Sequence, residues 1–242
     1  MLQSKQRLLE LNAKLAETLT SKGVTATADE TTTALVNKVT DIDDLLKILI
    51  ERDTMIDFNL PYGIKTIGKN AFYYNQCISS LKIPETVEII NDYAFVGCSK
   101  INGTLLIPKS VKKISSNAFD MCSGVDELIL SDGVEYLGYC CFRLCLKFKK
   151  ITIPSSLMNI GDYAFHRCEN IEIVKISEGF NCDNLNLSAS TLYTRETILQ
   201  WLNALADRTG QTAYKLTIGA KNLAKLTEED ILIATNKNWT LA

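Results

Sequence analysis

Hydrophobic positions recur with a fixed period through the central part of the chain. Five phenylalanines stand 23, 24, 23 and 23 residues apart, and a small residue precedes each one. The pairs are Ala71-Phe72, Ala94-Phe95, Ala118-Phe119, Cys141-Phe142 and Ala164-Phe165. Twelve residues after each phenylalanine, or thirteen in one case, comes a proline or a serine: Pro84, Pro108, Ser131, Pro154 and Ser177. A period of this length indicates a solenoid, in which neighbouring units stack to bury one continuous core.

Alternating apolar residues before each proline position predict short strands with one buried face. They stand one and three residues before it: Leu60 and Phe58, Ile83 and Leu81, Ile107 and Leu105, Leu130 and Leu128, Ile153 and Ile151, Ile176 and Val174. Stacked about 4.8 Å apart, six strands would form one sheet roughly 24 Å wide. A second apolar pair, three and six residues after the proline position, packs the turn and the far side of each coil.

The segment before the array has the pattern of helices. Leucines at helical spacing over residues 8–19 indicate an amphipathic helix, and Thr27 with Glu30 forms the capping box of a second one. A third apolar stretch covers residues 45–50. We expect residues 1–52 to form either a helical cap on the solenoid or an assembly segment, because a leucine stripe can also pair between chains.

Beyond Ser177 the period weakens, and strand-like and helix-like patterns alternate. The expected strands are at Leu185 and Leu187, at 216–219 and at 239–241, while Thr194 and the pair Thr227 and Asp230 cap two helices. The predicted division is therefore a helical segment (1–52), a repeat array (53–177) and irregular strand–helix repeats ending in a cap (178–242). The fold class is an α+β repeat solenoid.

One coil of the array reads Ile153-Pro154…Leu157…Ile160-Gly161-Asp162-Tyr163-Ala164-Phe165…Cys168…Ile171. Repeated in phase, this pattern resembles the BspA-like leucine-rich repeat family of bacterial surface proteins. The resemblance implies a leucine-rich-repeat solenoid with short parallel strands on one face and a non-enzymatic binding role. The array departs from the pattern at 102–104, where one residue is inserted, and at the two serines that replace proline.

Residues 9–42, 222–227 and 234–239 resemble segments that flank such repeats in proteins encoded by phages and prophages of gut Gram-positive bacteria. This resemblance implies a tail or tail-fibre component, made in the host cytoplasm, that leaves by lysis as part of the virion. It agrees with the first ten residues, which lack the layout of a signal peptide. The alternative is a secreted or cell-surface protein whose leader has been removed.

Composition narrows the classes of partner. The net charge of −2 argues against nucleic acid or an anionic membrane surface, since both need a concentrated positive patch. No apolar run approaches the roughly 20 residues of a membrane span, so membrane insertion is not expected.

The chain offers little chemistry for catalysis. His166 is the single histidine, and it follows a repeat phenylalanine at a position whose residue type varies from coil to coil, which favours an exposed surface residue. Asp126 and Glu127 are adjacent on a predicted strand, so their side chains point to opposite faces and cannot converge on one bond. We expect no catalytic residue, no metal site and no cofactor.

Cysteines form a further row. Cys98, Cys122, Cys145 and Cys168 each fall three residues after a repeat phenylalanine, so they should stack into a ladder. Adjacent rungs about 5 Å apart lie within reach of a disulfide. The absence of a Cys-x-x-Cys pair disfavours zinc, and we favour a reduced ladder of small buried side chains.

Binding is expected on the outward face of the predicted strands. The candidate residues are Lys82, Leu106, Ile129, Thr152 and Lys175 in one row, with Glu127 and Lys150 in the next. Two neighbouring apolar side chains rimmed by polar ones are typical of a recognition surface, although high strand propensity alone would also place them there. The candidate ligand is a protein or a cell-surface glycan, and residues 1–52 are a candidate site for self-association or for virion partners. A purely structural spacer or decoration is the remaining alternative.

Overall fold

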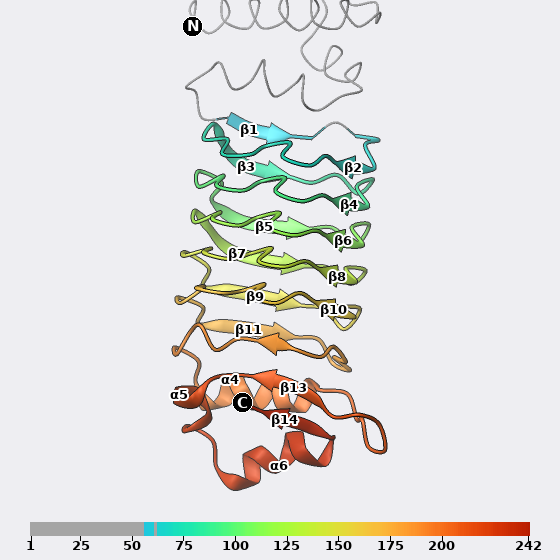
Figure 1. Cartoon of the computed structure of the whole chain (residues 1–242). Coiled ribbons are helices and arrows are strands. Elements are labelled where there is room, and N and C mark those ends of the chain that lie inside the picture. Colours follow the sequence, from blue (N-terminus) through green and yellow to red (C-terminus); the bar gives the residue numbers. More distant parts are fainter. Residues whose placement is uncertain (1–55, 61) are drawn as a thin grey trace, which may run out of the picture.

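The computed structural model describes residues 56–60 and 62–242, so the helices predicted within residues 1–52 lie outside the described residues. The described chain winds through stacked coils, and each coil of the repeat array contributes one short strand to each of two layers (Figure 1). Every strand pair is parallel, as expected for successive coils of a solenoid.

The first layer contains the strands that the alternating pattern predicts. They are β1 (Ile56–Asn59), β3 (Ile78–Lys82), β5 (Gly103–Ile107), β7 (Val125–Leu130), β9 (Lys150–Ile153) and β11 (Ile173–Ile176). In β7, for example, Leu128 and Leu130 are buried while Ile129 between them is partly exposed. The inward face of the layer is therefore apolar, and its outward face lies at the surface.

The second layer is a five-stranded sheet made of two-residue strands. It comprises β2 (Thr66–Ile67), β4 (Ile89–Ile90), β6 (Lys113–Ile114), β8 (Tyr136–Leu137) and β10 (Asn159–Ile160). The buried residue of each strand is the apolar one six positions after the proline position. Each buried residue thus fills the coil from the side opposite the first layer.

The expectation of one six-stranded sheet in the first layer was wrong. This layer is divided into a two-stranded sheet, β1-β3, and a four-stranded sheet, β5-β7-β9-β11. The division falls at the coil with the inserted residue, where Gly103 has a positive φ of 71° and the register with β7 shifts. An extra residue bends a strand and disrupts its ladder locally, so β5 does not continue the pairing of β3. The main-chain hydrogen bond from Asn102 N–H to Ser79 C=O (3.0 Å) still crosses the division.

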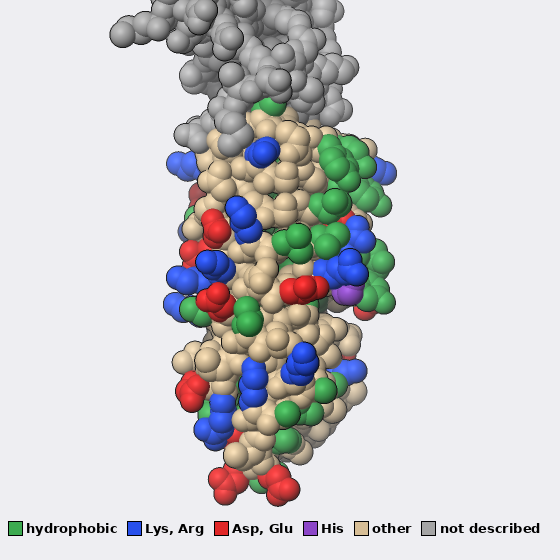
Figure 2. All heavy atoms as spheres, turned by 90° about the vertical axis from the view of Figure 1, so that its left-hand side faces the viewer, with side chains coloured by type: hydrophobic (Ala, Val, Ile, Leu, Met, Phe, Trp, Pro, Cys, Tyr) green, Lys and Arg blue, Asp and Glu red, His purple; other side chains and the backbone are tan. Residues whose placement is uncertain are grey.

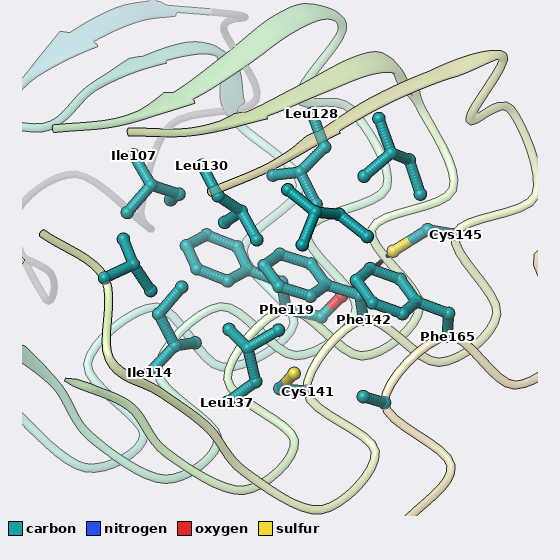
Figure 3. Packing of buried hydrophobic residues seen from close by; sticks show 14 of the residues in the cluster. Ile107, Ile114, Phe119, Leu128, Leu130, Leu137, Cys141, Phe142, Cys145 and Phe165 are labelled. Atoms are coloured by element: carbon teal, nitrogen blue, oxygen red, sulfur yellow. Dashed lines mark hydrogen bonds between the residues drawn. The ribbon is translucent and has the colours of Figure 1, made fainter. Parts of the chain in front are cut away.

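The repeat phenylalanines form a continuous stack at the centre of the core, and Figure 3 shows its last three rings, Phe119, Phe142 and Phe165. Neighbouring rings lie almost parallel, with centroids 4.7, 4.9, 5.4 and 5.7 Å apart from Phe72 to Phe165. The spacing follows the strand repeat of about 4.8 Å, because each ring comes from the same place in successive coils. The small residues before the phenylalanines are buried with them in the core.

A turn ridge runs along the array beside the phenylalanine stack. We use this name for residues 70–74, 93–97, 117–121, 140–144 and 163–167, which span two residues on either side of each repeat phenylalanine. The first and last residue of every segment has a positive φ, between 53° and 69°. Only two of these ten positions hold asparagine and one holds glycine, so most of these side chains bear a backbone conformation that few residue types favour.

Hydrogen bonds between consecutive segments of the turn ridge balance this strain. In each of the four junctions, the N–H groups of the first, third and fifth residues donate to carbonyls of the next coil at 2.6–3.1 Å. From the fourth segment to the fifth, Cys140, Phe142 and Leu144 donate to Asp162, Ala164 and His166. The turn ridge is therefore a third ladder, outside the two strand layers.

The C-terminal coils replace strands of the first layer by helices. The elements are β12 (Leu185–Asn186), α4 (Arg195–Ala204), β13 (Tyr214–Thr217), α5 (Ala220–Leu223), α6 (Glu228–Asn236) and β14 (Trp239–Leu241). The strands form a separate sheet, β12-β13-β14, while α4 contacts β11 and α6. Trp201 of α4 fixes this contact by donating its indole N–H to the carbonyl of Val174 in β11 (2.7 Å).

The caps predicted for the two longer helices are confirmed. Thr194 accepts a hydrogen bond from Thr197 N–H at the start of α4, and Thr227 with Asp230 forms a complete capping box at the start of α6. Asp230 is also held by a bidentate ion pair with Arg195, at 2.6 and 2.7 Å, which joins the two helix starts. None of the helices in the described part of the chain is long and apolar enough to cross a membrane.

Candidate functional site

The residues predicted for binding lie in two aligned rows on the first strand layer. Leu106, Ile129, Thr152 and Lys175 are register partners across β5, β7, β9 and β11. Glu127 and Lys150 are partners in the neighbouring row, which Thr104 and Ile173 complete. We call the outward side chains of β3, β5, β7, β9 and β11 the strand face.

Lys82 lies apart from these rows. It is exposed on β3, where its register partner is Asn59 of β1, and β3 belongs to the other sheet of the layer. The structure therefore brings six of the seven predicted residues into one four-stranded sheet and leaves Lys82 beyond the division.

The strand face combines a small apolar centre with cationic surroundings. Leu106 is 47% exposed, and Ile129 beside it is partly exposed. The side chain of Ile173, 41% exposed, adds an apolar group at the far end of the second row. Lys150 and Lys175 are exposed near this end, whereas Glu127 accepts a hydrogen bond from Thr104 Oγ1 (3.2 Å). This surface is suited to an amphipathic partner that offers apolar contacts and negative charge.

The turn ridge carries a second set of exposed side chains that the sequence reasoning missed. Five tyrosines on or next to it are between 38% and 56% exposed: Tyr73, Tyr74, Tyr93, Tyr139 and Tyr163. Figure 2 shows hydrophobic side chains gathered along one edge of the array, reaching the single histidine. The signal was present in the sequence as tyrosine two residues before Phe95 and Phe165, but the exposure of that position depends on the positive φ of the turn.

His166 is exposed, as expected, and its ring makes an edge contact with Tyr163 (centroids 5.2 Å apart). Within the described residues, no hydrogen bond joins its side chain to a serine, cysteine or carboxylate. The carboxylates of Asp126 and Glu127 have separate partners: Asp126 accepts from Gly103 N–H (3.2 Å), and Glu127 from Thr104. The described residues also contain no group of three His, Cys, Asp or Glu side chains placed to hold a metal ion.

The cysteine ladder is buried and has a defined hydrogen-bond pattern. Each thiol donates to the carbonyl of the phenylalanine in the preceding coil, at 2.9, 3.1, 3.3 and 3.1 Å from Cys98 to Cys168 (Figure 3 shows the bond from Cys145). Burial raises the pKa of Cys98 to about 12 and that of Cys122 and Cys145 well above 9.0. Cys98, Cys122 and Cys145 are therefore neutral thiols at neutral pH, which are poor nucleophiles and poor metal ligands.

Comparison with known proteins identifies the family. The model of the BspA-type leucine-rich repeat region matches residues 51–172 and 103–190 with six copies, which together span more than half of the chain. The chain belongs to this family, and the fold is a leucine-rich-repeat solenoid. No curated protein matches the chain.

One solved structure supports the fold, and two others show a weaker structural similarity. A leucine-rich repeat protein of Treponema pallidum shares 19% identity with a TM-score of 0.53, covering 78% of this chain and 86% of its own. A leucine-rich repeat protein of Bacteroides ovatus shares 29% identity with a TM-score of 0.48, covering 65% of this chain. This chain spans only 39% of the Bacteroides protein. A leucine-rich cell-surface protein of Faecalibacterium prausnitzii shares 15% identity with a TM-score of 0.33, covering 76% of this chain and 59% of its own.

Proposed function

We propose that the protein is a non-enzymatic binding module that recognises a protein or a cell-surface glycan with the strand face. The observation that carries this proposal is the alignment of Leu106 and Ile129 at its centre, with Lys150 and Lys175 beside them on the same four-stranded sheet. The buried phenylalanine stack holds the strands rigidly, so this surface is preorganised and binding does not have to order it.

A charge placed at the centre of the strand face tests the proposal. We would screen the full chain against a glycan array and a display library of bacterial surface proteins, and then repeat each positive result with Ile129→Lys. We expect binding to weaken at least tenfold with the fold retained, because the lysine removes apolar contact and adds repulsion beside Lys150. The matched control is Ile89→Lys, an exposed isoleucine of β4 in the opposite layer. If every ligand binds the Ile129→Lys variant with the same affinity as the wild type, the strand face is not the binding site, and a structural spacer becomes the favoured function.

The setting we propose is a virion, as a tail or tail-fibre component. The support is the resemblance of residues 9–42 and of the C-terminal segments to the flanks of phage-encoded repeat proteins. A secreted or surface-displayed protein is the alternative. Light scattering on the full chain and on a chain starting at Asp53 separates the two. An oligomer that becomes a monomer on truncation would support assembly through residues 1–52, whereas two monomers would favour the surface protein.

A further inference from the structure

The last coil of the array leaves a row of main-chain donors without acceptors. In all four earlier junctions of the turn ridge, the first, third and fifth N–H groups are bonded to the next coil. The corresponding groups of the last segment belong to Tyr163, Phe165 and Arg167, and none of them has a hydrogen-bond acceptor among the described residues. The carbonyls of Asp162, Ala164 and His166 are all bonded to the preceding coil. The open side of this segment is therefore a row of donors.

The adjoining strand contributes acceptors to the same edge. Along the second layer, two carbonyl groups of each coil accept hydrogen bonds from N–H groups of the next coil. The Glu135 carbonyl, for example, accepts from Met158 and Asn159, and the Leu137 carbonyl accepts from Gly161. The equivalent carbonyls of the last coil are those of Met158 and Ile160. Within the described part of the chain neither accepts a hydrogen bond, since β10 pairs only with β8. Acceptors on β10 thus lead directly into the row of donors.

A groove opens along this edge. It has a volume of about 590 Å³ and lies between residues 160–169 on one side and the β12 and β13 strands on the other. Asn184, Asn186 and Ser188 line the wall formed by the β12 segment, and Lys215 and Thr217 line the part formed by β13. Its size falls within the range of about 300–1,000 Å³ that is typical of ligand sites.

The change from strand to helix accounts for the groove. Neighbouring strands lie about 4.8 Å apart, whereas a packed helix needs about 8–10 Å. Trp201 fixes α4 against β11, so the first helical coil is thicker than the coils of the array. On the opposite layer, β12 consequently stands away from β10 and pairs with β13 instead. The space left has the width of about one strand.

We infer that this groove binds an extended polypeptide segment of a partner, which adds one half-coil between β10 and β12 through main-chain hydrogen bonds. A polypeptide is the ligand that offers both complements: N–H groups for Met158 and Ile160, and carbonyls for Tyr163, Phe165 and Arg167. Hydrogen bonding along an exposed edge is a known mode of peptide recognition. The site is separate from the strand face, and neither proposal depends on the other.

The charges of the groove favour a polypeptide over a simple anion. Arg167 and Lys215 are balanced by Asp162 and Glu169 in the lining, so the charged side chains give no net positive field. The amide groups of Asn184 and Asn186 can serve the peptide bonds or side chains of a segment that runs past them. Affinity would come from the main chain, and recognition would tolerate a range of sequences.

Amide hydrogen exchange tests the free edge without a ligand. In the ¹⁵N-labelled full chain, we expect the amides of Tyr163, Phe165 and Arg167 to exchange at least tenfold faster than their bonded counterparts, Cys140, Phe142 and Leu144. The two sets occupy the same positions in adjacent coils, so they are matched internally. Equal protection in both sets would mean that the donors already have partners, and it would overturn the proposal.

A peptide probe tests occupancy. The probe is a synthetic peptide with the sequence of residues 158–167, because that segment makes the same bonds to the coil before it. We expect saturable binding and slower exchange at Tyr163, Phe165 and Arg167. The same peptide N-methylated at the residue equivalent to Gly161 cannot donate to Ile160, so it should bind at least tenfold more weakly.

A filled groove provides the second control. Thr217→Trp places a bulky ring in the lining and should weaken peptide binding at least tenfold, whereas Thr66→Trp, on β2 outside the groove, should leave it unchanged. Three results would overturn the inference: no saturation up to about 1 mM peptide, equal binding by both variants, or equal binding by the N-methylated probe. Protection of the same amides by sulfate or a neutral oligosaccharide, but not by the peptide, would overturn it in favour of those ligands.

Discussion

Replacing Phe119 by alanine should destabilise the array more than the same change at Phe165. Both side chains are almost fully buried, at 0% and 3% exposure, so each substitution removes a large apolar group and leaves a cavity. That loss costs about 3–5 kcal/mol in most proteins. The two sites differ in their neighbours along the stack: Phe119 lies between Phe95 and Phe142, whereas Phe165 stacks on Phe142 and on no second ring among the described residues.

The difference can be estimated from the ring contacts. One stacked aromatic pair contributes about 0.5–1.5 kcal/mol beyond its buried area, so Phe119→Ala should cost about 1 kcal/mol more than Phe165→Ala. In a solenoid the stability is approximately a sum over coils and their interfaces, and Phe119 contributes ring contacts to two interfaces whereas Phe165, the last ring of the stack, contributes one to a single interface. Both variants should melt well below the wild type, by roughly 2–4 °C for each kcal/mol.

Urea unfolding, followed by circular dichroism and by tryptophan fluorescence, measures these costs. Both tryptophans, Trp201 and Trp239, lie in the C-terminal coils, so fluorescence reports on that end while circular dichroism reports on the whole chain. Coincident transitions would justify a two-state free energy. If Phe165→Ala proved as costly as Phe119→Ala or more so, the phenylalanine stack would not be the element that couples the coils.

Three further predictions concern a glycine contact, the thiols and an ion pair. Gly138→Ala should lower the free energy of unfolding, measured by a thermal melt, by about 1–3 kcal/mol, because its new Cβ would lie 2.5 Å from backbone atoms of Ser115 and Ser116. Gly68 has the same repeat position but nothing within 4 Å of an added Cβ, so Gly68→Ala should leave the stability unchanged or raise it. Equal effects of the two substitutions would refute this account. In the folded protein, a thiol reagent at neutral pH should modify partly exposed Cys77 and leave the buried ladder intact, and rapid reaction at Cys122 in the folded state would contradict this. The free energy of unfolding should also fall as the pH rises from 9.0 towards 12, because burial raises the pKa of Cys98 and the unfolded chain loses that proton first. The Arg195 guanidinium lowers the pKa of Asp230, so the ionised carboxylate stabilises the fold, and this stabilisation is lost in acid as the pH falls through the folded-state pKa, which lies below 3.8. Asp230→Asn should therefore lower the melting temperature at pH 7 and make the melting temperature decline less steeply in acid. Glu229→Gln, at an exposed neighbouring position, should have neither effect.

The elements that could be predicted from the sequence are those set by local or periodic rules. Side-chain alternation placed the strands of the first layer, and a constant offset from the phenylalanine placed the cysteine ladder. The helix caps at Thr194 and Thr227 were predictable because a cap is defined within four residues. The alignment of the strand-face rows followed from the same period, and the register of β5, β7 and β9 confirms it.

Features that depend on departures from the period could not be predicted. The single inserted residue near Gly103 was visible, but whether it would bulge outward or divide the sheet depends on the register that the neighbouring strands can keep. The side chain of Tyr163 is exposed because its backbone has a positive φ, a conformation that tyrosine does not favour. At the corresponding position of the earlier coils, hydrogen bonds to the next coil hold the same conformation.

The groove beside β10 illustrates how the end of a repeat array can form a binding site that the repeats themselves do not have. Inside the array, every coil satisfies the coil before it, so the pattern of one coil predicts the contacts of the next. At Phe165 this regularity stops, because β12 of the following coil does not pair with β10, and the coil after that packs helix α4 where the earlier ones pack a strand. Main-chain donors that are bonded in four successive segments of the turn ridge become available at the fifth segment, although the backbone conformation of that segment is the same. The proposed binding edge therefore arises where coils with the strand spacing meet a coil with the larger spacing of a packed helix. Neither the repeat array nor the C-terminal coils would form this edge alone.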